Sequence, residues 1–493
     1  MKHRLHKLML ATLLAIPARG DNASSLATAV EAGDVAQIER LLAAQTEVNS
    51  AQADGMTPLH WAVYRDDTNL SKHLLELGAN ASAENRYGIH PLYLACLNGN
   101  AELVSELLKA GADPNSTIRG GETALMTAAR TGKAGAVTAL IEAGAQLDSS
   151  ERGGQTAIMW AAAEGHTEVV KTLLDAGADF TSALERSGFT PFFFAIRGGH
   201  TNTVKLFLDH GIDVNATMTH ERSGGRLPMR GTSPLILAIE NGHYDLAVDL
   251  LDAGADPSDD RSGYTPLHTL TWIRKPDFGE SEAGDPPPKG SGRRNSTQMA
   301  RELVAHGADV NARLKRGRRA GGGNVSVIGA TPLFLAADRA DLEYMQLLVE
   351  LGADPLMPND DGCTPLMVAA GIGSTAPEEE AGSEAECLAA VKFLVSVGAS
   401  IDTVDANGET AMHGAAYKNI PSMVEYLNSL GADINIWNTE NKLKRTPLLI
   451  AQGYRPGNFK PSFATADAIV AAMLSHGVKP PSGPKPKHTN YAN

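Results

Sequence analysis

The feature that most constrains this chain is a glycine that returns at a fixed interval, each time after a leucine-rich segment. The first three intervals are 33 residues and the fourth is 34. Gln45 stands 33 residues before the first of these glycines and marks an earlier, degenerate copy. The glycines are Gly78, Gly111, Gly144, Gly177, Gly211, Gly254, Gly307, Gly352, Gly398, Gly431 and Gly477. Twelve copies of one unit therefore account for most of the 493 residues, which are too many for a single hydrophobic core.

Each copy predicts a pair of short helices. The first helix starts with a threonine and a proline, as in Thr57–His60, because threonine caps a helix and proline fits its first position. A Gly-His pair such as Gly165-His166 ends it, and an amphipathic segment such as 167–177 forms the second helix. The terminal glycine supplies a left-handed residue, and the following Asp/Asn-rich segment forms a turn into the next copy.

No single copy can bury its own apolar stripe, so neighbouring copies must stack. The order of Thr-Pro-Leu-His, Gly-His, a leucine pair and Gly-Ala-Asp-x-Asn at about 33 residues closely resembles the ankyrin-repeat family. The resemblance covers residues 24 to about 478. It implies an all-α fold, an ankyrin-repeat solenoid of about twelve helix-turn-helix modules with projecting β-turns and a concave face that binds a protein partner.

Four regions follow from where the pattern is regular and where it is interrupted. We expect a signal peptide at 1–20, regular repeats with an N-terminal cap at 21–217, and repeats with inserted loops and a C-terminal cap at 218–478. A disordered tail is expected at 479–493. The looped half, which closes with Arg-Pro-Gly-Asn-Phe-Lys-Pro at 455–461, also resembles exported bacterial ankyrin-repeat proteins with insertions in their C-terminal repeats.

The N-terminal segment has the order of a secretory signal. Basic residues from Lys2 to Lys7 precede the apolar run 8–16, and small residues surround Arg19 before a cleavage point near Gly20–Asp21. We therefore expect an exported protein, periplasmic or secreted. The alternative is a cytoplasmic chain whose first repeat begins with an amphipathic segment.

Composition and motifs argue against catalysis and against a bound cofactor. Three distant cysteines form no CxxC pair, HExxH is absent, and histidines such as His60 and His166 occupy ordinary repeat positions. No nucleophile elbow or phosphate-binding loop is present. We expect no enzyme activity, no metal and no cofactor. The net charge of -14 disfavours nucleic acid, and no other segment is apolar enough for stable membrane insertion. A monomer is expected.

Two other classes of function stay open. The looped C-terminal repeats could hold the site of an enzyme or a regulatory subunit, because insertions gather there. The basic run at 313–319 could grip a nucleic-acid phosphate, although a solvated loop balanced by the acidic run 378–380 explains it as well.

The candidate contact residues lie at turn tips and on the solvent side of the first helices, at positions that the repeat does not use for packing. Arginine and tyrosine recur among them, and these residue types are enriched at binding hot spots. We expect a protein partner to contact Met56, Tyr64, Arg65, Arg86, Tyr87, Leu97, Glu122, Arg130, Gln155, Glu164, Arg186, Phe189 and Arg197.

Overall fold

The structure, a computed structural model, describes residues 25–220, 229–276, 287–316, 325–377, 379–455 and 460–481. The expected signal peptide and residues 482–493 of the expected tail lie outside the described residues, as do Arg318 and Arg319 of the basic run. The chain divides into two compact units, Met1–His210 and Gly211–Asn493, and each is described by itself.

The first unit contains six helix pairs within its described residues. The pairs are α2 (Leu26–Ala32) with α3 (Val35–Ala43), α4 (Pro58–Tyr64) with α5 (Thr68–Glu76), α6 (Pro91–Asn98) with α7 (Ala101–Lys109), α8 (Ala124–Thr131) with α9 (Ala134–Glu142), α10 (Ala157–Glu164) with α11 (Thr167–Asp175), and α12 (Pro191–Gly198) with α13 (Thr201–Asp209). These pairs coincide with the units read from the glycine spacing.

The second unit contains six more pairs in its described part. They are α14 (Pro234–Glu240) with α15 (Tyr244–Asp252), α16 (Pro266–Arg274) with α17 (Ser296–Ala305), α18 (Pro332–Asp338) with α19 (Leu342–Glu350), α20 (Pro365–Ala369) with α21 (Glu384–Ser396), α22 (Ala411–Tyr417) with α23 (Pro421–Ser429), and α25 (Pro447–Ala451) with α26 (Phe463–Ser475). The one-turn helix α24 (Ile434–Trp437) follows α23.

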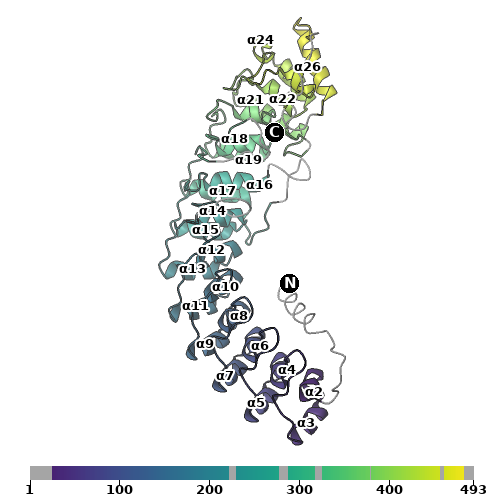
Figure 1. The fold of residues 1–493 in the computed structure, drawn as a ribbon. Coiled ribbons are helices and arrows are strands. Elements are labelled where there is room, and N and C mark those ends of the chain that lie inside the picture. The colour runs from purple at the N-terminus through teal and green to yellow at the C-terminus, as the bar shows by residue number, and fades with distance from the viewer. Residues whose placement is uncertain are drawn as a thin grey trace. The chain divides into compact units, whose positions relative to one another are not determined.

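Within each unit the helices form two layers (Figure 1). In the first unit, α4, α6, α8, α10 and α12 pack on one another in sequence, and α5, α7, α9, α11 and α13 do the same beside them. The described residues contain no strand, and Thr117 and Thr123 form an isolated bridge. The prediction of an all-α repeat solenoid with about twelve modules is confirmed.

Histidines at the first helices join neighbouring repeats. The Thr57 backbone N–H donates to His60 Nδ1 at 3.2 Å, and the His60 backbone N–H donates back to Thr57 Oγ1 at 3.3 Å. Because Nδ1 accepts, the ring proton sits on Nε2, which donates to Ile89 O of the next repeat at 3.0 Å. His268 and His413 repeat this arrangement, with Nε2 donating to Ala330 O at 3.1 Å and to Thr439 O at 3.2 Å.

The turns at the opposite end of each repeat are also joined. Asn49 Nδ2 donates to Gly78 O at 3.0 Å, and Asn49 Oδ1 accepts the Asn80 N–H at 2.7 Å. Asn115 and Asn215 make the same two bonds to the turns that follow them. Gly78 is left-handed with φ 88°, and Gln45 at the degenerate copy is also left-handed, with φ 52°. The backbone therefore keeps the repeat geometry where the glycine is missing.

In the second unit, part of an inserted segment is tied down by an ion-pair cluster. Arg274 Nε donates to Asp341 Oδ2 at 3.0 Å, and its Nη2 donates to Glu343 Oε2 at 3.1 Å. The Arg274 guanidinium also lies 4.7 Å from the centre of the Tyr344 ring, which is fully buried. Arg274 ends α16 where the insertion begins, so this cluster joins the end of α16 to the start of α19 in the following repeat.

The described part of the insertion after α20 folds inward. Glu380 is 2% exposed, and its Oε1 accepts the backbone N–H groups of Thr375 at 2.7 Å and Ala376 at 3.1 Å. Lys418 Nζ donates to Ala381 O, and the buried Arg455 donates to Ala416 O. These loop segments are integral parts of the packing.

The buried histidines predict that acid destabilises the array. Burial lowers the pKa of His60, His268 and His413 from 6.5 to about 4. Between these two pH values the unfolded chain binds protons that the folded chain does not, so stability falls as pH falls through this window. From pH 7.5 to pH 5 we expect a loss of about 2 kcal/mol per histidine, measured as a shift of the urea midpoint by circular dichroism.

The matched control replaces the three rings by a neutral amide, in the variant His60→Gln/His268→Gln/His413→Gln. Glutamine can still donate and accept, but it does not titrate. The loss of stability between the two pH values should be clearly smaller in this variant. An equal loss in parent and variant would show that other groups cause the acid sensitivity.

Candidate functional site

One spatial relation organises the candidate surface of the first unit. The residue just before the capping threonine contacts the residue eight positions later, at the end of the first helix. Glu122 meets Arg130 in this way, and Phe189 meets Arg197. The same relation joins Tyr264 to Trp272 and Glu409 to Tyr417 within repeats of the second unit. Several sequence-predicted contact residues are therefore pairs within one repeat.

At the N-terminal side of this surface, Tyr64 and Arg65 end α4. Tyr64 is half-buried and stands edge-on to Trp61, with ring centres 5.7 Å apart. Trp61 Nε1 donates to Gln52 Oε1 at 2.8 Å, which fixes the indole. Arg65 is exposed, and its Nη1 donates to Glu31 O at 3.2 Å. Tyr64 thus rests on a fixed aromatic base.

The next element of the surface is an ion pair with its own support. Arg130 Nη2 donates to Glu122 Oε1 at 2.9 Å, and Thr127 Oγ1 donates to the same oxygen at 2.9 Å. The Arg130 guanidinium lies 5.5 Å from the centre of the Trp160 ring in the following repeat. Burial, with Glu122 close by, raises the pKa of Tyr93 to about 12, so this phenol stays protonated at neutral pH.

The last element is an arginine that covers two phenylalanine rings. The Arg197 guanidinium lies 4.8 Å from the centre of the Phe189 ring and 5.0 Å from that of Phe194. The two rings are 5.1 Å apart. Arg197 itself is exposed at the end of α12, so a partner would meet the cation and not the rings beneath it.

Two of the expected contact residues, Met56 and Phe189, are buried in the structure. Met56 is 1% exposed and Phe189 is 3% exposed, so neither side chain is free to touch a partner. Both precede a capping threonine, and an apolar residue at that position packs against the start of the helix and the next repeat. Asn85 Nδ2 of the following repeat lies 3.3 Å from Met56 Sδ, which places the thioether between repeats.

The other eleven residues are accessible to different degrees. Tyr64, Leu97, Glu122, Arg130 and Gln155 are half-buried. Arg65, Arg86, Tyr87, Glu164, Arg186 and Arg197 are exposed. The helix ends and the turn tips lie on successive repeats of one unit, but the ion pair and the stacked rings already engage some of them.

Sequence reasoning missed two residues at the turn tips. Arg119 and Arg152 are exposed and stand four residues before a capping threonine, in the position that Arg86 and Arg186 hold in their repeats. The signal was available in the 33-residue spacing between Arg86, Arg119 and Arg152.

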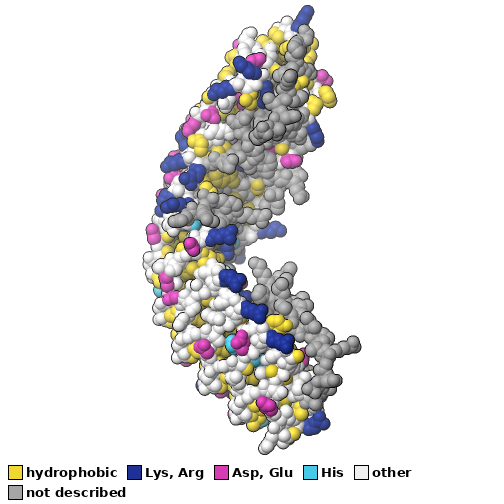
Figure 2. All heavy atoms as spheres, viewed as in Figure 1, with side chains coloured by type: hydrophobic (Ala, Val, Ile, Leu, Met, Phe, Trp, Pro, Cys, Tyr) yellow, Lys and Arg dark blue, Asp and Glu magenta, His cyan; other side chains and the backbone are white. Residues whose placement is uncertain are grey.

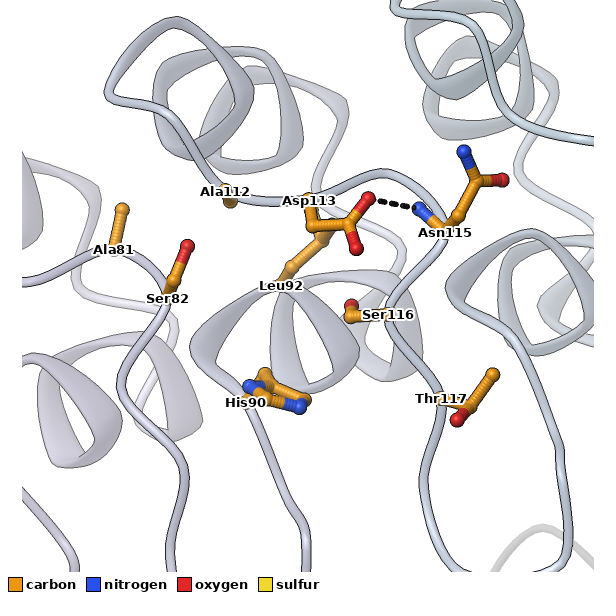
Figure 3. Close-up of a pocket in the computed structure, with 9 residues that line it drawn as sticks. All are labelled: Ala81, Ser82, His90, Leu92, Ala112, Asp113, Asn115, Ser116 and Thr117. Carbon is orange, nitrogen blue, oxygen red and sulfur yellow. Dashed lines mark hydrogen bonds between the residues drawn. The ribbon is translucent and has the colours of Figure 1, made fainter.

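A cavity of about 420 Å³ lies in the first unit beside the start of α6 (Figure 3). His90 occupies the capping position there without making a side-chain cap, and its Nδ1 lies 3.2 Å from Ala83 O. The remaining lining is mostly small and polar, with Asp113 as the other titratable side chain. Across the part of the chain that the structure describes, no three His, Cys, Asp or Glu side chains form a group that could hold a metal ion.

The described part of the basic run is partly neutralised. Arg313 Nη2 lies 2.8 Å from Asp360 Oδ1, and Lys315 Nζ lies 2.5 Å from Asp260 Oδ2. Within the described residues these two aspartates are the carboxylates that contact the basic run, and Glu380 of the acidic run is buried in its own loop. The described helices include none with the length and apolar character that crossing a membrane requires.

Comparison with known families identifies the repeat. Residues 26–118, 115–183 and 180–260 match a model described as ankyrin repeats in three copies. Residues 333–376 and 380–428 match a second model, described as ankyrin repeats in many copies. Together the two models cover more than half of the chain, and neither describes an enzyme.

Curated relatives share part of the chain. Ankyrin repeat domain-containing protein 63 from Homo sapiens is 32% identical over 203 residues, which are 41% of this chain and 43% of that protein. The Mus musculus protein of the same name is 31% identical over 203 residues, covering 41% and 42%. NF-kappa-B inhibitor alpha from Sus scrofa is 32% identical over 111 residues, covering 21% and 31%. The matches span less than half the length of these relatives.

The burial of Phe189 predicts a stability effect that an exposed contact residue would not have. Phe189→Ala should lower the free energy of unfolding by about 3 kcal/mol, because it leaves a cavity under Arg197. Tyr87→Ala, at a side chain that is 38% exposed, should change it by less than about 1 kcal/mol. Urea unfolding followed by circular dichroism compares the two variants, and equal effects would contradict the packing described for Phe189.

Proposed function

This chain belongs to the ankyrin-repeat family, and we propose that it is a protein-binding scaffold whose partner lies along one surface of the first unit. Ankyrin repeats generally mediate protein–protein interactions. The proposed surface combines the turn tips with the ends of α4, α6, α8, α10 and α12. We further propose that the chain acts as a monomer.

The main support for the proposal is that side chains at equivalent positions of consecutive repeats are accessible to solvent. Tyr64, Arg65 and Tyr87 are at least partly exposed there, and Arg197 ends α12 on the solvent side. Tyrosine and arginine contribute large contact areas and charge-assisted hydrogen bonds, which is why they are enriched at binding hot spots. A stack of repeats presents such positions as an extended surface suited to one long partner.

The family comparison supports the class of activity. One relative is named NF-kappa-B inhibitor alpha, a name that refers to the factor it inhibits and not to a reaction it catalyses. The described parts of the insertions in the second unit are engaged in packing, as Glu380 and Arg274 illustrate. These observations favour recognition by the first unit over a site in the looped repeats.

Capture of the partner from an extract of the native host tests the proposal. Tyr64→Ala and Tyr87→Ala should each weaken capture about fivefold to tenfold, because each removes a contact worth about 1 kcal/mol or more. Affinity capture with the purified full chain, followed by mass spectrometry and titration of the captured protein, provides the measurement.

Leu77→Ala is the matched control for the capture experiment. Leu77 is an apolar side chain 48% exposed at the end of α5, in the repeat that also contains Tyr64, but it lies on the other helix layer. It should leave capture unchanged. If both tyrosine variants hold the partner as tightly as the parent, the proposed surface is wrong, and the insertions at 274–295 and 371–387 become the candidates.

We also propose that binding takes place outside the cytoplasm, in the periplasm or after secretion. The support is the succession of basic, apolar and small residues at 1–20, a pattern typical of secretory signals. The mature protein is then expected to begin near Asp21. N-terminal sequencing of protein isolated from the host checks this, and an intact Met1 or Lys2 would exclude cleavage.

A further inference from the structure

Four arginines occupy the same position on four consecutive turns of the first unit. Arg86, Arg119, Arg152 and Arg186 each stand four residues before the capping position, at spacings of 33, 33 and 34 residues. All four are exposed. We call this set the tip arginines. Figure 2 shows Lys and Arg side chains recurring at intervals along one edge of the lower unit.

The tip arginines lack carboxylate partners in the part of the chain that the structure describes. A fifth arginine at the same repeat position, Arg261 of the second unit, provides the internal comparison. Its Nε lies 2.7 Å from Asp259 Oδ1, and its Nη2 lies 3.1 Å from Asp259 Oδ2, so it is held in a two-point ion pair. The turns of the first unit have no aspartate at the position that Asp259 occupies, two residues before the arginine.

Acidic residues do occur in these turns, but they form no ion pair with the tip arginines. The Glu151 carboxylate turns back to accept the backbone N–H groups of Gly153 at 2.7 Å and Gln155 at 3.2 Å. Glu84 and Glu185 are exposed, and the structure gives neither an ion pair with an arginine. The four guanidinium groups therefore keep their donors available for a ligand, apart from one bond between neighbouring tips, Arg119 Nη2 to Arg86 O at 3.1 Å.

Backbone hydrogen bonds join two of the tips to the turn before them. The Arg86 N–H donates to Asp54 O of the preceding turn at 2.9 Å, and the Arg152 N–H donates to Gly120 O at 2.9 Å. The first helices beneath them pack side by side, which sets a repeat distance of about 8–10 Å. The tip arginines thus form a row of cations with a step of about that length.

This step matches one extended peptide conformation. A polyproline II segment has three residues per turn and rises about 3.1 Å per residue, so every third side chain points the same way, about 9 Å apart. Guanidinium groups bind carboxylates through two parallel hydrogen bonds. Tyr87, beside Arg86 and 38% exposed, adds an aromatic ring of the kind on which prolines pack. The net charge of -14 disfavours a nucleic acid as the ligand.

We propose that the tip arginines bind an acidic, proline-rich segment of a protein partner, held as a polyproline II helix with a carboxylate at every third residue. The proposal rests on the function proposed above and specifies the chemistry of the partner. A regular row of cations selects for spacing as well as for charge, which distinguishes it from a generally basic surface.

The test uses the full chain and a fluorescein-labelled peptide of four Glu-Pro-Pro units, followed by fluorescence anisotropy at low salt. The parent should bind this peptide and lose affinity as salt rises, because exposed ion pairs are screened. Arg119→Gln/Arg152→Gln should bind about tenfold more weakly, since exposed pairs each contribute a few-fold at most. Circular dichroism confirms that the variant is folded.

The matched control protein is Arg40→Gln/Lys171→Gln, which removes two exposed cations of the same unit that lie away from the tips. It should bind the peptide within twofold of the parent. Two control peptides separate charge from spacing: one with glutamine in place of glutamate, and one of equal composition with glutamate at every second residue. Both should bind at least fivefold more weakly than the Glu-Pro-Pro peptide.

Several results would overturn the proposal. The first is equal affinity of the parent and of Arg119→Gln/Arg152→Gln for the Glu-Pro-Pro peptide. The second is equal affinity of the parent for the Glu-Pro-Pro peptide and for the peptide with glutamate at every second residue. The third is tighter binding of a twelve-nucleotide oligothymidine than of the Glu-Pro-Pro peptide. A host protein could also be captured that the peptide does not displace and that Arg119→Gln/Arg152→Gln binds as tightly as the parent. This result would support the scaffold function and refute the tip arginines as its site. Arginine-dependent peptide binding without any captured host protein would support the tip arginines and count against the scaffold function.

Discussion

The structure depends on one constraint: a single helix pair is too small to bury its own apolar face. Each repeat therefore completes its core with side chains of its neighbours, and polar bonds fix how the neighbours meet. The imidazole of His60 illustrates this, because it caps its own helix through Nδ1 and reaches Ile89 O of the next repeat through Nε2. The turn asparagines do the same at the other end. A residue that serves packing in this fold usually serves two repeats at once.

This double use decides what is left for recognition. In each repeat the interior is formed by the capping threonine, the following leucine and the small residues of the first helix. The end of the first helix and the turn tip stay accessible, and there the chain varies its residues. A variable side chain is not always available to a partner, however, because the residue before the cap contacts the residue eight positions later. Glu122 with Arg130 and Phe189 with Arg197 are such pairs, so a partner would meet one member supported by the other.

The second unit shows how the same constraint accommodates insertions. Where a long segment interrupts a repeat, ion pairs and hydrogen bonds of largely buried groups fix the helix ends and loops beside it. Arg274 with Asp341 links α16 to the start of α19, and Glu380 organises its own loop through backbone N–H groups. The Arg274 and Asp341 side chains are 11% and 12% exposed, so removing one partner leaves a largely desolvated charge less well compensated, which is destabilising. The described parts of the insertions are for this reason better understood as structural joints than as free binding loops.

The sequence by itself determined the number of repeats, the two helices in each, and where they begin and end. These features depend on local chemistry: threonine and proline start a helix, and a left-handed residue ends it. It also determined that Tyr64, Arg65 and Tyr87 fall at positions the repeat leaves accessible. The positions of the tip arginines could also be predicted from the sequence, since these residues recur at the spacing of the repeat.

Only the tertiary structure decided which side chains at similar positions are buried and which charges are paired. Met56 and Glu122 both precede a capping threonine, yet the first lies between repeats while the second reaches an arginine at the helix end. Likewise Arg261 has a carboxylate partner and Arg152 has none in the described residues, although they share a repeat position. Spacing along the chain fixes which repeat a residue belongs to. The direction of its side chain depends on the size and charge of the neighbours that the stack brings beside it.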